Sequence, residues 1–326
     1  MSTPHCLVPW LVSTILILWS AANVFPHEGP EHEIEELTEE IRKLGESADL
    51  LTERAIEYRV LGKYSEASRD LERATRLDPG SIHAYREWSR VLFLSGKIQE
   101  AIDTVSRALT LKVEDAVEVG GLHATRAEFL RAKNDYNRAL NDCQAALKAH
   151  QQNPEWYLLR SDLHDRLGMT KERLLGIEEG IKETGSGVLE IERVEALIKD
   201  QQFEPALETI ESELKSSRML SSWLIRRARV RHGMGKKAEA HDDLRVALAE
   251  IANRLNLTTP DVPLLLDKAL AHELLGEKPE ARRCYELARD HGAEDIVKEK
   301  LKELKETAGT LANDPKVNKV EGKTRD

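Results

Sequence analysis

The stretch ADLLTERAIEYRVLGKYSEASRDLERATRLDPGS, residues 48–81, contains the pattern from which the fold follows. Its apolar and small side chains return at helical spacing on both sides of Gly62, and it ends at Pro79, which cannot continue a helix. The pattern predicts two amphipathic helices joined by a tight turn. Small residues, Ala55 in the first helix and Ala67 in the second, mark where the helices cross closely.

The same pattern returns along the chain at intervals of 33 to 41 residues. One small position recurs in every unit but the fourth, as Ala67, Ala101, Ala139, Arg173, Ala206, Ala240 and Ala281. A glycine precedes it by five positions in five units, as Gly62, Gly96, Gly168, Gly235 and Gly276. A second small position follows it by seven, as Ala74, Ala108, Ala146, Gly180, Glu213, Ala247 and Ala288. Such self-similarity indicates one helical unit stacked many times.

The unit resembles the tetratricopeptide repeat through Ala55, Tyr58, Gly62, Tyr64, Ala67, Ala74 and Pro79. The resemblance implies an all-α, right-handed α-solenoid of about seven tetratricopeptide-like helix-turn-helix repeats. The predicted units lie near residues 48–81, 82–115, 120–153, 154–186, 187–220, 221–254 and 262–292. The fourth and fifth units are degenerate, because Arg173 and Glu213 replace small residues.

Shorter segments flank the predicted repeats. The pattern predicts a polar lead-in and an amphipathic helix over residues 23–47, a charged capping helix over residues 293–307, and a disordered tail over residues 308–326. Residues near 114–120 are expected to form an insertion before the third unit.

The composition fits a thin helical solenoid better than a globular enzyme, with 5% aromatic and 33% charged residues. The net charge of −10 argues against a nucleic-acid partner, because backbone binding needs a basic face. Of the three cysteines, Cys143 and Cys284 fall in the second helices of distant units, so they are expected to be small buried residues.

The chain begins with an apolar run, residues 7–19, that ends in Ser20-Ala21-Ala22. This pattern predicts a signal peptide over residues 1–22, cleaved after Ala22, although the segment before the run has no Lys or Arg. A retained membrane anchor is the alternative. Both interpretations predict an exported protein, periplasmic in a bacterium, with membrane association only through this segment.

His27 and His32, with carboxylates between them, form a candidate site for Cu(II) or Zn(II). The alternative interpretation is a polar segment that leads into the next helix. No cofactor is expected.

In the tetratricopeptide family the first helices of the units line a concave surface that binds extended peptides. The resemblance therefore implies a groove that alternates in charge, lined by Arg86, Arg90, Glu128, Arg131, Asp162, Asp165, Glu192, Glu195, Arg226, Arg229 and His232. Arginines pair with carboxylates, so an acidic segment or a chain terminus is the expected ligand. The alternative is that these charges neutralise one another. Arg227 and Arg231 fall where the inner stripe should be apolar, so they snorkel, pair with Glu192 or Glu195, or mark a slip of register.

No phosphate loop, nucleophile elbow or zinc-protease motif is present in the sequence. The sequence thus predicts a non-catalytic scaffold that binds a protein or peptide partner. A metal-handling protein and a structural subunit of a membrane-attached assembly are the alternatives. The spacing from His27 to Thr38, ahead of the repeats, resembles that of exported bacterial repeat proteins.

Overall fold

The computed structural model describes residues 29–312 apart from 217 and 257, with side chains described as far as residue 305. Over that part of the chain the regular structure is helical throughout, without strands, so the predicted all-α fold is confirmed. The contacts divide the chain into two compact units, Met1–Glu192 and Arg193–Asp326. The predicted leader, residues 1–22, lies outside the described residues.

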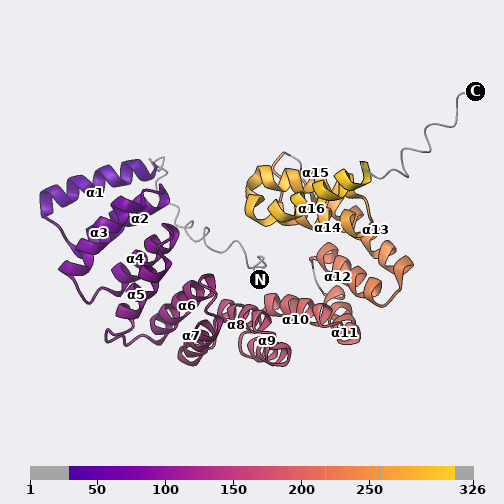
Figure 1. Ribbon diagram of the computed structural model, residues 1–326, viewed down its shortest axis with the longest axis horizontal. Coiled ribbons are helices and arrows are strands. Elements are labelled where there is room, and N and C mark those ends of the chain that lie inside the picture. The colour runs from indigo at the N-terminus through magenta and orange to yellow at the C-terminus, as the bar shows by residue number, and fades with distance from the viewer. Residues whose placement is uncertain (1–28, 217, 257, 313–326) are drawn as a thin grey trace, which may run out of the picture. The chain divides into compact units, whose positions relative to one another are not determined.

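Successive helices pair along the first unit, each linked to the next by a short connection (Figure 1). A single helix, α1, precedes four pairs: α2 with α3, α4 with α5, α6 with α7, and α8 with α9. The bounds are α1 Pro30–Leu44, α2 Ala48–Val60, α3 Tyr64–Leu77, α4 Ile82–Leu94, α5 Ile98–Ala108, α6 Ala116–Ala132, α7 Tyr136–Ala149, α8 Pro154–Arg166 and α9 Thr170–Thr184.

The division between the units falls inside the next helix, α10 (Gly187–Lys199). In the second unit α12 pairs with α13 and α14 with α15, and α16 packs on α15. The bounds are α11 Phe203–Leu214, α12 Leu220–Gly233, α13 Lys237–Arg254, α14 Val262–Leu274, α15 Lys278–Ala288, a one-turn π-helix η1 Arg289–Ala293, and α16 Glu294–Ala312. None of the helices in the described ranges is both long enough and apolar enough to cross a membrane.

The first helix of a repeat commonly begins with a side-chain cap. In α2 the hydroxyl of Ser47 accepts a hydrogen bond from the N–H of Leu50 at 3.1 Å, and in α14 the carboxylate of Asp261 accepts one from Leu264. Such caps satisfy backbone donors that have no partner within the helix. They explain why the polar residues between repeats mark the starts of these helices.

The turn inside each repeat has one conformation. In the first repeat the N–H of Lys63 donates to the carbonyl of Tyr58 at 2.8 Å, and the same bond closes the turn in the other repeats. It needs one left-handed residue, as in a Schellman motif. The φ angles at this position run from 57° to 81°, at Gly62, Gly96, Asn134, Gly168, Gln201, Gly235 and Gly276. The structure thus shows that Asn134 and Gln201 occupy the glycine position in the third and fifth repeats.

Replacing Gln201 with glycine is expected to stabilise the protein by about 0.5–1 kcal/mol, because a left-handed backbone strains a residue with a Cβ atom. Chemical denaturation followed by circular dichroism measures the change. The matched control is Gln202→Gly, where φ is −84° and glycine should destabilise the turn. Equal effects of the two substitutions would contradict this explanation of the turn.

Small residues let the paired helices cross closely, as predicted. Ala55 and Ala67 are fully buried in the first repeat, next to the half-buried rings of Tyr58 and Tyr64. In the fourth repeat a Cβ atom on Gly180 would lie 2.6 Å from the ring of Tyr157, so only glycine fits there. The degenerate fourth repeat therefore keeps close packing at this position through a smaller residue.

Two segments differ from their predicted ends. The insertion expected near residues 114–120 mostly extends α6, which begins at Ala116 after the cap of Asp115 on the N–H of Val117. The last helix, α16, ends at Ala312, beyond the predicted end of the capping helix. The cysteines Cys143 and Cys284 are both buried and free of disulfides.

Candidate functional site

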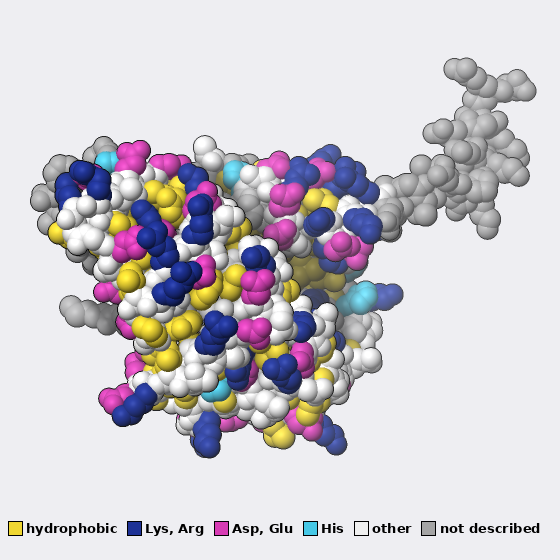
Figure 2. Space-filling view, turned by 60° about the vertical axis from the view of Figure 1, so that its left-hand side comes forward, with side chains coloured by type: hydrophobic (Ala, Val, Ile, Leu, Met, Phe, Trp, Pro, Cys, Tyr) yellow, Lys and Arg dark blue, Asp and Glu magenta, His cyan; other side chains and the backbone are white. Residues whose placement is uncertain are grey.

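The first helices of the repeats carry the residues predicted to line the groove. Arg86 and Arg90 lie on α4, Glu128 and Arg131 on α6, Asp162 and Asp165 on α8, Glu192 and Glu195 on α10, and Arg226, Arg229 and His232 on α12. Burial raises the carboxyl pKa of Glu128, and the nearby Arg131 and Arg90 oppose that rise. On the face that Figure 2 presents, basic and acidic side chains are interspersed and form no field of one sign.

In the first two repeats one buried carboxylate holds two arginines. Glu87 on α4 is 4% exposed, and its oxygens lie 3.3 Å from Nε of Arg59 on α2 and 2.6 Å from Nη1 of Arg90. Glu87 therefore links neighbouring repeats, because Arg59 reaches it from the preceding first helix. Neither Arg59 nor Glu87 was predicted from the sequence as a site residue.

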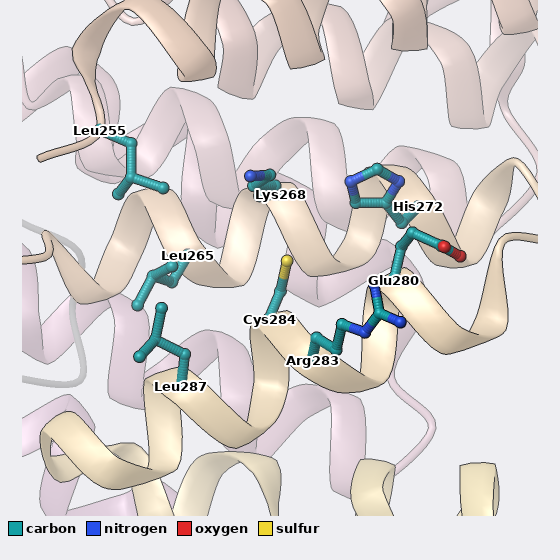
Figure 3. Close-up of a pocket in the computed structure, with 8 residues that line it drawn as sticks. All are labelled: Leu255, Leu265, Lys268, His272, Glu280, Arg283, Cys284 and Leu287. Atoms are coloured by element: carbon teal, nitrogen blue, oxygen red, sulfur yellow. The ribbon is translucent and has the colours of Figure 1, made fainter. Parts of the chain in front are cut away.

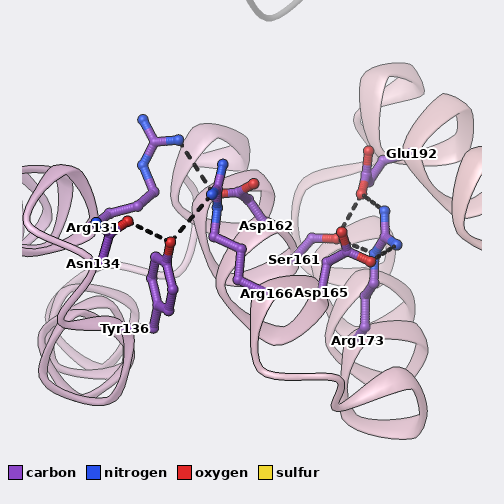
Figure 4. A network of polar contacts seen from close by, with 9 residues as sticks. All are labelled: Arg131, Asn134, Tyr136, Ser161, Asp162, Asp165, Arg166, Arg173 and Glu192. Carbon is purple, nitrogen blue, oxygen red and sulfur yellow. Dashed lines mark hydrogen bonds and ion pairs between the residues drawn. The ribbon is translucent and has the colours of Figure 1, made fainter.

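A second ion pair links α6 to α8 (Figure 4). Nη1 of Arg131 donates to Asp162 at 3.2 Å, and Nε of Arg166 donates to the same oxygen at 2.9 Å. The guanidinium of Arg166 also lies over the ring of Tyr136, 5.5 Å from its centroid. The phenol of Tyr136 donates in turn to the amide oxygen of Asn134 at 2.6 Å.

The arginine that breaks the small-residue pattern, Arg173, forms the centre of a third network (Figure 4). Its guanidinium donates to Ser161 at 2.9 Å, to Asp165 at 2.8 Å and to Glu192 at 2.7 Å, and its side chain is 11% exposed. Ser161 occupies in α8 the position that Ala55 occupies in α2. A hydrogen bond therefore replaces the contact of two small side chains at this helix crossing.

In the second unit Glu195 pairs with both predicted arginines of the next first helix. Its oxygens lie 2.9 Å from Nε of Arg226 and 2.7 Å from Nη1 of Arg229. The side chains of all three residues are at most 30% exposed. Most predicted groove charges are thus paired within the protein, as the alternative interpretation holds.

A different pair, which was not predicted from the sequence, fastens the two helices of a repeat together. Arginine and aspartate sixteen residues apart form a bidentate pair in the first, third and sixth repeats, with bonds of 2.6–3.0 Å: Arg54 with Asp70, Arg126 with Asp142, and Arg227 with Asp243. Both residue types recur at one register and one spacing, which was the available signal. Arg227 and Arg231 thus bind Asp243, not Glu192 or Glu195, and the register of the sixth repeat holds.

These arginine–aspartate pairs are largely buried. Asp142 is 7% exposed, and burial favours a higher pKa, but hydrogen bonds from Arg126 and His123 bring that pKa below its ordinary value. The bond to Asp243 likewise raises the pKa of Arg227. Both partners are therefore held in their charged forms.

Comparison with known proteins agrees with this architecture. Residues 25–169 match the family described as the ETO1 C-terminal domain. A tetratricopeptide repeat protein from Parabacteroides merdae has the same fold, with a TM-score of 0.55 and 18% sequence identity over 84% of this chain and 99% of that one. The chain is a tetratricopeptide repeat protein.

Two curated relatives align with parts of this tetratricopeptide chain. ETO1-like protein 1 of Arabidopsis thaliana is 40% identical over 29% of the chain and 10% of its own length. DnaJ homolog subfamily C member 3 of Homo sapiens is 24% identical over 72% of the chain and 51% of its own length. The chain thus spans about half or less of the length of these relatives.

Two charged side chains on the first helices of the tetratricopeptide repeats remain unpaired among the described residues. The guanidinium of Arg86 on α4 is half-buried and has no hydrogen bond or ion pair, and its Nε atom is inaccessible to solvent. The carboxylate of Asp267 on α14 also has no such partner. Burial raises the Asp267 pKa to about 6, with Asp261 and Glu250 adding to the rise and Arg226 and Arg254 opposing it.

The structure describes only one of the two predicted metal ligands. His27 lies outside the described residues, and Nε2 of His32 on α1 lies 3.2 Å from Glu36. Within the described part of the chain, no group of three or more potential ligands comes together.

Proposed function

We propose that the chain is a non-catalytic protein-interaction scaffold that binds an extended acidic peptide segment along the first helices of its repeats. The observation that carries this proposal is the guanidinium of Arg86, which is unpaired among the described residues. A buried polar group without a partner costs free energy, and such a group in a folded protein needs an explanation. A carboxylate of a bound peptide satisfies this guanidinium with charge-assisted hydrogen bonds.

The surroundings of Arg86 favour an anionic ligand. Arg59 and Arg90 both pair with Glu87, so α2 and α4 carry three guanidinium groups and one buried carboxylate here. The side chain of Arg90 is 47% exposed and is therefore open to a second acidic group. A stacked pair of rings, Phe93 and Phe129, with centroids 4.6 Å apart, adds an apolar element on α4 and α6.

The other predicted groove residues have a supporting part in this proposal. Arg131, Asp162, Asp165, Glu192, Glu195, Arg226 and Arg229 already satisfy one another or Arg173. A peptide would have to displace an internal partner to bind them. We therefore place the anchor of the peptide in the first two repeats.

The test is quantitative affinity capture from an extract of the organism that makes the protein. We expect Arg86→Met and Arg86→Glu to recover a specific partner at least about tenfold less than the unchanged protein, the scale of one lost charge-assisted contact. Arg86→Met keeps the apolar stem and removes the charge, so it separates binding from packing. Overlapping synthetic peptides of the captured partner should then locate an acidic segment.

The matched control is Arg107→Glu, an exposed arginine of α5 whose side chain has no partner among the described residues. It should leave capture unchanged. Circular dichroism checks that each variant keeps its helices. Equal recovery by Arg86→Met and the unchanged protein would overturn the anchor, and so would a binding segment without acidic residues.

A further inference from the structure

The last repeat contains an apolar pocket of about 250 Å³ between α14, α15 and the residue that follows α13 (Figure 3). Leu255, Leu265 and Leu287 form its walls, and the sulfur of Cys284 points into it (Figure 3). Drug-sized ligands need about 300–1,000 Å³. The pocket is therefore suited to a single large side chain.

The first repeat has a pocket of about 420 Å³ at the same register, but its chemistry is different. Arg54, Asp70 and Arg73 stand there in place of Lys268, Cys284 and Leu287. Arg54 and Asp70 form the bidentate pair described above, and Arg73 binds Glu46. The groove of the first repeat is thus filled by internal ion pairs.

In the last repeat the corresponding ion pair is lost, because Cys284 replaces the aspartate. Within the described part of the chain, the side chains of Lys268 and Arg283 at the pocket have neither a hydrogen bond nor an ion pair. His272 binds Glu277 at 2.6 Å, and Glu280 contributes one negative charge. Among the described residues, the lining therefore has two unpaired cations, one carboxylate and an apolar interior.

We propose that this pocket binds a leucine-sized side chain of a partner protein that has an aspartate or glutamate beside it. The apolar walls exclude water from the side chain, and Lys268 and Arg283 pair with the neighbouring carboxylate. The site shares no residue with the peptide anchor at Arg86. The two proposals can therefore fail independently.

The experiment selects phage-displayed random dodecapeptides on the immobilised full chain and measures the enriched peptides by fluorescence anisotropy. We expect enrichment of Leu, Ile or Met next to Asp or Glu. Cys284→Met fills the pocket and Arg283→Glu reverses a charge at it. Each should weaken binding about tenfold or more, the scale of burying one leucine side chain.

The matched control is Arg69→Glu, which makes the same change at the same register of the first repeat, where the side chain is 72% exposed. It should leave the affinity unchanged. A saturating peptide should also slow iodoacetamide labelling of Cys284, resolved by peptide mass spectrometry, and leave Cys143 unaffected.

Three results would overturn the proposal: enriched peptides without the acidic–apolar pair, equal binding to Cys284→Met, or unprotected labelling of Cys284. A dimer in light scattering that Cys284→Met converts to a monomer would also overturn it, because a second copy of the chain would then occupy the pocket. Peptides that lose binding only with Arg86→Met would support the proposed function and refute this second site.

Discussion

Replacing Asp243 with alanine is expected to destabilise the sixth repeat by about 3–5 kcal/mol, the cost of leaving buried charges without their partner. Asp243 is 3% exposed and accepts hydrogen bonds from Arg227, at 3.0 and 2.6 Å, and from Arg231 at 2.8 Å. Their side chains are 21% and 20% exposed, so water replaces the lost carboxylate only in part. The free energy of unfolding in urea measures this loss.

The adjacent residue provides the control. Asp242 is 76% exposed and lies 3.8 Å from Arg245, so Asp242→Ala should change stability by less than about 0.5 kcal/mol. Hydrogen exchange should show the loss of protection concentrated in α12 and α13, because each repeat contacts mainly its neighbours. Equal effects of the two substitutions would mean that the buried pair does not hold the helices together.

Replacing Asp267 with asparagine is expected to stabilise the protein at pH 7, by about 1–3 kcal/mol. The carboxyl pKa is about 6 in the folded chain and about 3.9 in an unfolded one, so the folded state binds the proton more tightly. As pH rises from 4 to 6 the unchanged protein therefore loses stability that the asparagine variant keeps. Asparagine has no charge to desolvate.

The measurement is the unfolding free energy of both proteins between pH 4 and 8. The advantage of Asp267→Asn should grow from pH 4 to about pH 6 and then remain constant. The exposed Asp103 of α5 serves as a control, since Asp103→Asn should give no such dependence. A difference that stays constant over the whole range would show that Asp267 titrates normally.

Particular residues show how far the sequence predicts this fold. The recurring glycine of the turn and the small residues at the crossing located the helix pairs, because both follow from backbone geometry within one repeat. Asn134 and Gln201 were missed at the same turn, since their side chains do not indicate a left-handed backbone. Arg173 was recognised as an exception, but the sequence did not show that it bonds to Ser161, Asp165 and Glu192.

The candidate site was less predictable, for a physical reason. The helical period places a side chain on a face of its own helix, so it was enough to assign Arg86, Glu195 and Arg229 to first helices. Whether such a charge pairs with a neighbour depends on how adjacent helices are spaced and rotated, which packing of the whole repeat sets. Local sequence therefore established the repeated helix pairs, and three-dimensional packing established that Glu195 holds Arg229 while Arg86 stays unpaired among the described residues.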